Sequence, residues 1–178
     1  ASIPTSSAGS TVTVTVNKQP IPSAQMSIFV FEDNAPTNGA VDQGSELGLG
    51  GFQINLEDAG GRYGQVGGLM LQDAFGQPLR NALPCAPTAL PGVIITCSDG
   101  TALVQNLPPG KYGVSAIPPA GAPIRWVQTT TIEGKKVNDA WVKAGEPPFF
   151  QDFGPPGYHI FVGFVSPDRL TMPAVPVG

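Results

Sequence analysis

The stretch Met26-Ser27-Ile28-Phe29-Val30-Phe31-Glu32 is the part of the sequence that most clearly decides the fold. Its aliphatic residues occur at every second position, and aromatic residues fill positions between them. A period of two is the pattern of a β-strand, in which successive side chains point to opposite faces of the sheet. Because both faces are apolar, we expect this strand and the similar segment Ile160–Phe164 to lie in the centre of a sheet.

Comparable alternation recurs along the chain, and helical spacing is nearly absent. We expect further strands at residues 11–16, 51–57, 68–71, 92–96, 101–105, 111–117, 125–132, 137–142 and 157–165. Clusters of Pro, Gly, Asn and Asp separate these segments, as turn chemistry requires. About ten short strands spaced in this way are typical of an all-β protein, an antiparallel β-sandwich or barrel.

The composition fits one turn-rich domain. The chain has 178 residues, with 23 Gly, 20 Pro and only 12% charged residues, against roughly 25% in average soluble proteins. The formal net charge of −4 has the wrong sign for binding a phosphate backbone, so we expect no nucleic-acid partner. No run of about 18 apolar residues occurs, so we expect no membrane insertion.

We divide the chain into an N-terminal extension (1–25), a β-sandwich domain (26–165) and a Pro-rich tail or linker (166–178). The first residues, Ala1-Ser2-Ile3-Pro4, fit the product of signal-peptide cleavage, although a cloned fragment would look the same. Secretion is therefore permitted by the sequence.

The N-terminal extension contains a regular strand pattern at residues 11–16, with Val12, Val14 and Val16 on one face. Such an uncharged strand must pair, because an open β-edge promotes aggregation. It can fold back as an edge strand of its own sandwich. Alternatively, it can complete the sheet of a neighbouring copy, since the two Pro residues that follow it disfavour a tight hairpin. Repetition of that second contact would build a filament.

The single histidine, His159, lies within the apolar segment 157–165. No Gly-x-Ser-x-Gly or other nucleophile motif accompanies it, so we interpret it as a hydrogen-bonded strand residue rather than a catalytic base. One His and two Cys do not complete a zinc site. We therefore do not expect an enzyme, because a hydrolase would need a second polar cluster beside His159 that the sequence does not reveal.

The two cysteines, Cys85 and Cys97, flank a Pro-containing segment. An even pair without other thiol chemistry favours a disulfide, which would close a loop of about 13 residues and stabilise the fold by roughly 3 kcal/mol. A disulfide implies an oxidising compartment. The alternative is a pair of buried thiols in a cytosolic protein.

Five oxygen-bearing side chains follow the segment 26–32 within a short polar loop. They are Asp33, Asn34, Asn38, Asp42 and Glu46. Calcium takes about six to eight oxygen ligands, several of them carboxylates. The loop therefore suggests a calcium site, and the alternative is a polar loop held by Asx turns without an ion.

Several of these segments together have a familiar order. They are Ile28–Asn34, Asn38-Gly39 followed by Asp42 and Glu46, Leu49–Phe52, Ile54–Leu56 and Asn106–Val114. This order resembles that of SdrD B-like domains, which are prealbumin-like, Cna B-type β-sandwich modules of bacterial surface adhesins and large secreted proteins. The resemblance implies a prealbumin-like or immunoglobulin-like sandwich, an extracellular or cell-surface location, a structural or adhesive role and a bound calcium ion.

We therefore expect a structural or adhesive module of a bacterial surface assembly or fibre, whose partners are copies of itself or neighbouring surface-protein domains. The alternative is a ligand-binding module, for carbohydrate for example, that uses Trp126, Trp141 and Tyr158 as stacking faces. Exposure of the two Trp side chains would favour this alternative. The Phe-rich segment 146–157 is expected to be an ordered loop with its rings packed inward, and an exposed aromatic binding loop is the other interpretation.

Overall fold

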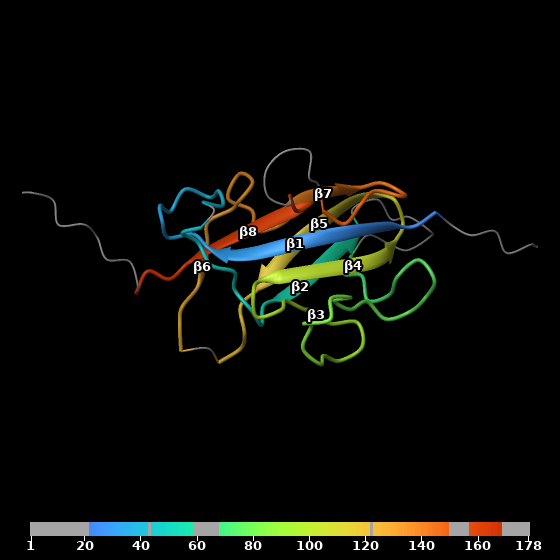
Figure 1. Ribbon diagram of the computed structural model, residues 1–178, viewed down its shortest axis with the longest axis horizontal. Helices are drawn as coiled ribbons and strands as arrows, with labels where there is room; N and C mark the ends of the chain where they lie inside the picture. Colours follow the sequence, from blue (N-terminus) through green and yellow to red (C-terminus); the bar gives the residue numbers. More distant parts are fainter. Residues whose placement is uncertain (1–21, 43, 59–67, 122, 150–156, 169–178) are drawn as a thin grey trace, which may run out of the picture.

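The computed structural model describes residues 22–42, 44–58, 68–121, 123–149 and 157–168, and within these ranges it contains strands and no helix. Eight strands form two four-stranded sheets, with the orders β4-β1-β8-β6 and β3-β2-β5-β7 (Figure 1). The strands are β1 Ala24–Glu32, β2 Gln53–Asp58, β3 Ile94–Ile95, β4 Thr101–Leu107, β5 Gly110–Ile117, β6 Val127–Gln128, β7 Asn138–Val142 and β8 Ile160–Val165. The predicted β-sandwich is confirmed. The predicted strand at 11–16 and the tail beyond residue 168 lie outside the described residues.

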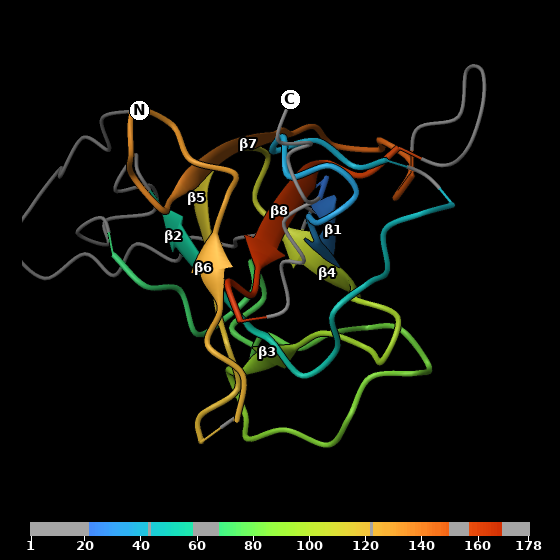
Figure 2. The ribbon, with the colours of Figure 1, turned by 90° about the vertical axis from the view of Figure 1, so that its left-hand side faces the viewer.

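The two sheets form two layers (Figure 2), and the side chains of the core lie between them. The aliphatic residues of β1 are fully buried, as the period of two requires, and they share one cluster with residues such as Ile54 and Leu56 of β2. Aromatic rings join the layers, because the ring of Phe52 lies 4.9 Å from that of Phe164 in β8. At about 25 cal/mol per Å² of buried apolar surface, this cluster is the main source of stability.

Strands β1 and β8 are the two central strands of their sheet, as expected from their apolar faces. They pair in parallel, with Ile28 opposite Ile160 and Glu32 opposite Phe164, whereas the other strand pairs among the described residues are antiparallel. The two strands consequently run side by side in the same direction (Figure 1). The described chain therefore enters the sandwich at one end, where β1 begins, and leaves it at the other end, where β8 finishes.

A Pro-Pro-Gly corner carries the chain from β4 in one sheet to β5 in the other. The buried Tyr112 at the start of β5 donates its hydroxyl hydrogen bond to the backbone oxygen of Pro108. A tight turn before β4 uses Gly100, whose φ of +80° suits glycine. A Cβ at Gly100 would lie only 2.2 Å from the backbone oxygen of Val30, so no other residue fits this close approach.

Three predicted strands are corrected by the structure. The segment 92–96 shortens to β3, because the backbone N–H of Val93 still donates to the oxygen of Leu90 in the turn before it. Residues 68–71 form only an isolated bridge, between Leu69 and Glu57 of β2. Two backbone hydrogen bonds join this segment to β2, and the chain then turns away from the sheet at Asp73. The segment 125–132 shortens to β6, since its remainder turns on itself where Ile132 and Lys135 exchange backbone hydrogen bonds.

The two edges of the β1 sheet differ. At the β4 edge, the backbone N–H groups of Ala82 and Ala74 donate to the oxygens of Leu103 and Asn106, so the loop 74–82 covers this edge. At the other edge, β6 pairs only with the last two residues of β8. Among the described residues, no strand pairs with Ile160–Val162 on the side away from β1.

Candidate functional site

The acidic loop after β1 is organised around Asp33, which is fully buried. Its carboxylate oxygens each accept a backbone N–H at 2.8 Å, Oδ1 from Asn38 and Oδ2 from Gly39. The Asp33 backbone is also engaged, because its N–H donates to Phe164 of β8. The loop therefore folds around a buried carboxylate that caps two amides and sits at the end of the central strands.

Glu46 plays a similar part at the far end of the loop. Its Oε1 accepts the backbone N–H groups of Asn34 (2.9 Å) and Ala35 (3.2 Å), and its Oε2 accepts that of Asp42 (2.8 Å). Two other predicted residues meet on the surface, where Nδ2 of Asn38 donates to Oδ2 of Asp42 at 2.9 Å. The structure thus brings the five predicted residues into one loop.

The donor types in this loop suit calcium, but the two buried carboxylates already have hydrogen-bond donors. Asp33 and Glu46 direct their carboxylate oxygens at backbone N–H groups, which are hydrogen-bond donors. Among the described residues, the acidic side chains of the loop do not form a group whose ligand atoms all lie within 4.8 Å of one another. In this arrangement the carboxylate oxygens of Asp33 and Glu46 are engaged by backbone N–H groups, and calcium binding stays a prediction that requires some of these bonds to be exchanged.

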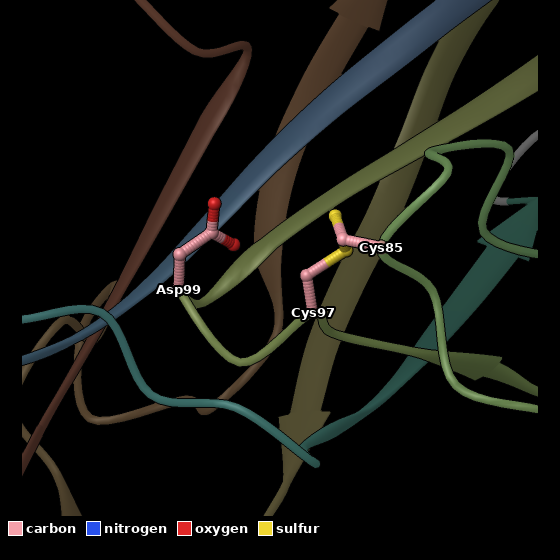
Figure 3. Close-up of side chains that lie close together, drawn as sticks. All are labelled: Cys85, Cys97 and Asp99. Atoms are coloured by element: carbon pink, nitrogen blue, oxygen red, sulfur yellow. A yellow bond between two sulfur atoms is a disulfide. The ribbon is translucent and has the colours of Figure 1, made fainter.

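The predicted disulfide between Cys85 and Cys97 is present. Asp99 lies next to it (Figure 3), and its carboxylate accepts the backbone N–H and the hydroxyl of Thr101. Sulfurs joined to each other do not offer the thiolates that bind metals. The disulfide is therefore a covalent brace that ties the loop around Cys85 to the turn between β3 and β4.

The brace borders a groove that was not predicted from the sequence. The groove has a volume of about 770 Å³ and lies between the loops 73–83 and 86–93, beside Gln105 and Asn106 of β4. A second hollow of about 390 Å³ adjoins it at the same two residues, and is lined also by the start of β1 and the turn at Gly145. No local sequence signal marks the groove, because its walls are loops positioned by distant contacts.

A second polar cluster, also missed at the sequence level, surrounds His159. Its Nδ1 accepts the backbone N–H of Ser27 at 3.1 Å and lies 2.9 Å from the Ser27 hydroxyl. Its Nε2 lies 3.6 Å from Oε2 of Glu146. The cluster ties the start of β8 to β1 and to the 143–146 turn. Burial lowers the pKa of His159, and the neighbouring Glu146 carboxylate partly opposes this effect.

The combination of Ser, His and Glu resembles a hydrolase triad only in residue types. Ser27 is fully buried within β1, so a substrate has no access to its hydroxyl. The same Nδ1 that faces this hydroxyl also accepts a backbone N–H, so it is not available as a general base. The cluster is best understood as a hydrogen-bonded clasp between strands.

The three aromatic residues considered as a stacking platform do not share a surface. Trp126 packs against the core, 6.0 Å from the ring of Phe52. Tyr158 stacks on Phe29 at 5.1 Å, on the outer side of the β1 sheet. Trp141 is 68% exposed and belongs to β7 in the other sheet. The structure therefore does not bring these three residues together as the stacking platform of the alternative interpretation.

The aromatic rings around Tyr158 continue into the described part of the Phe-rich segment. Phe149 is half-buried and meets Tyr158 edge to face at 5.3 Å. The remaining rings of that segment, Phe150 and Phe153, lie outside the described residues.

Within the described residues no helix is long and apolar enough to cross a lipid bilayer.

No protein-family model matches the sequence, and a search of curated proteins finds no match. Among solved structures, the chain is similar to GBS52, the minor pilin of the Gram-positive pathogen Streptococcus agalactiae, with a TM-score of 0.43 and 11% sequence identity. The similarity covers 88% of this chain and 49% of the pilin chain, so this chain spans about half the length of that protein.

Proposed function

We propose that this protein is an extracellular structural module of a bacterial surface assembly or fibre. The observation that carries the proposal is the parallel pairing of β1 and β8 at the centre of one sheet. This pairing puts the entry and the exit of the domain at opposite ends of the sandwich, which suits a module linked to others in a row. The disulfide supports an oxidising, extracellular compartment.

The same proposal includes assembly by strand donation. The segment 11–16, with Val12, Val14 and Val16 on one face, supplies an uncharged strand, and the edge of β8 at Ile160–Val162 has no strand beside it among the described residues. A strand added to such an edge gains main-chain hydrogen bonds and apolar packing together. Because donor and acceptor are different segments of the chain, the contact between copies is heterologous, and without ring closure it would extend into a filament.

Sedimentation and negative-stain electron microscopy of the intact chain test this proposal. We expect concentration-dependent linear assembly that is lost on deletion of residues 1–16. A synthetic peptide of residues 11–16 should bind the deleted protein and cap the intact one. An intact protein that stays monomeric at high concentration, or a deleted protein that assembles as the intact one does, would show that the strand is not donated.

A further inference from the structure

The groove beside β4 offers hydrogen-bonding side chains that the fold itself does not use. Its lining is more polar than apolar, and Gln77, Arg80 and Gln105 lie exposed along it. In the part of the chain that the structure describes, no hydrogen bond or ion pair engages these three side chains. An amide side chain carries donors and an acceptor together, and a guanidinium group carries donors. The groove therefore presents several polar groups that a ligand can satisfy.

Local contacts hold these groups in place. Oδ1 of Asp73 accepts the backbone N–H groups of Phe75 (2.8 Å) and Gln77 (2.9 Å), and its Oδ2 accepts the side-chain amide of Asn106 at 3.3 Å. Asn106 lines both the groove and the adjoining hollow, and its φ of +60° lies in the left-handed region that non-glycine residues rarely adopt. Strained backbone of this kind is concentrated at binding and active sites. The groove is therefore preformed, as binding sites usually are.

An extended peptide cannot pair with β4 in this groove, because the neighbouring loop already covers the edge of the strand. The backbone N–H of Leu103 donates to the side chain of Asn81, and the Leu103 oxygen accepts the backbone N–H of Ala82. The oxygen of Asn106 accepts the backbone N–H of Ala74. Main-chain hydrogen bonds give the affinity when a peptide adds to a sheet edge. Recognition in this groove therefore relies on its side chains.

The charges of the groove do not favour an ionic ligand. Among the described residues that line it, only Asp73 and Arg80 are charged, and their formal charges cancel. A lining of zero net charge attracts neither a polyanion nor a polycation. The lining is apolar at Leu90, which is 77% exposed, and at Pro87 and Pro91. A ligand that suits both parts is uncharged and carries hydroxyl groups together with an apolar ring face.

We propose that the groove beside β4 binds a neutral oligosaccharide. The hydroxyl groups of a sugar ring donate and accept hydrogen bonds as amide side chains do, and the C–H groups on the ring face suit an apolar wall. The groove of about 770 Å³ adjoins the hollow of about 390 Å³ at Gln105 and Asn106, so consecutive sugar units can occupy the two. Neither hollow is lined by Trp126, Trp141 or Tyr158. Binding here also needs no contact between copies of the chain.

A printed array of neutral oligosaccharides, with sialylated and sulfated counterparts, tests this site when it is probed with the full chain. We expect saturable binding to neutral members and no preference for the charged counterparts. Calorimetric titration with the best-bound neutral oligosaccharide then compares variants. Gln105→Ala should raise Kd roughly three- to tenfold, as expected for one lost hydrogen bond, and Gln77→Ala should act in the same direction. Gln72→Ala is the matched control, because Gln72 is exposed and lines neither hollow.

The urea midpoints of the three variants should equal that of the unmodified protein, so that a change in Kd reports on the groove and not on folding. Three results would overturn the proposal: no saturable binding to any neutral member, a preference for the charged counterparts, or an unchanged Kd in both groove variants. Deletion of residues 1–16 separates this site from strand donation. We expect oligosaccharide binding to survive that deletion whether or not assembly does, and its loss would place the site in the N-terminal extension and overturn the proposal.

Discussion

Substitution of Asp33 by Ala is expected to destabilise the fold without any involvement of calcium. The change removes the acceptors of two 2.8 Å bonds from the backbone N–H groups of Asn38 and Gly39. A bond to a charged group contributes about 1.5–3 kcal/mol, but these donors lie near the surface and are partly rehydrated when the acceptor is lost. We therefore expect a loss of about 2–3 kcal/mol in the free energy of unfolding.

The assay is urea denaturation followed by tryptophan fluorescence, with EGTA present throughout. With a slope of about 2 kcal/mol per molar urea, the midpoint should fall by roughly 1–1.5 M. Asp33→Asn retains one acceptor oxygen but turns an amide N–H₂ toward a donor, so it should lose at least half as much stability. Asp42→Ala is the control, since the Asp42 carboxylate meets the side chain of Asn38 at an exposed site and should contribute less than about 0.5 kcal/mol.

Equal midpoints for the Asp33→Ala and Asp42→Ala variants would refute the reasoning, because they would mean that the buried carboxylate does not hold the loop. An effect of Asp33→Ala that appears only when calcium is added would refute it in another way. In that case the loop would owe its order to an ion and not to its own amides.

Four further predictions follow from the same structure. If the loop 33–46 binds calcium, a hundredfold excess over Kd should stabilise the protein by about 2.7 kcal/mol; an unchanged melting temperature in EGTA would count against the site. Burial lowers the pKa of His159 in the folded protein. The stability that this residue contributes is therefore present above the unfolded pKa of about 6.5 and is lost as the pH falls through the lower folded pKa. Chemical denaturation between pH 7.5 and 5 should show a decline in the free energy of unfolding that His159→Gln reduces. Reduction of the bond between Cys85 and Cys97 should lower stability by about 3 kcal/mol, measured with and without reductant after intact mass has confirmed two thiols; no change would mean that the loop around Cys85 is ordered without it. Gly163→Ala should destabilise by about 1–3 kcal/mol, because its Cβ would lie 2.8 Å from an aromatic ring and 2.6 Å from a hydroxyl oxygen; a calorimetric midpoint equal to that of the unmodified protein would contradict this.

Local pattern was sufficient for the fold class and for the central strands. The period of two in β1 and β8, with apolar residues on both faces, predicts strands buried on both sides, and both lie in the middle of their sheet. The disulfide was predictable because two cysteines at short separation have few other uses. These features depend on residues that lie close together in the sequence. The alternation of side chains along a strand and the closure of a short disulfide loop are both local properties.

Other features depended on contacts between distant segments. The parallel direction of β8 beside β1 is set by how the intervening strands are distributed between the two sheets, which no local period encodes. Ser27, Glu146 and His159 meet although more than a hundred residues separate Ser27 from the other two. The five oxygen-bearing residues of the acidic loop were found from their spacing in the sequence. The directions of the Asp33 and Glu46 carboxylates, however, are decided by backbone amides that become available only once the loop has closed. The groove beside β4 arises in the same way, because its loop walls have a common position only after Asn81 and the disulfide attach them to the sheet.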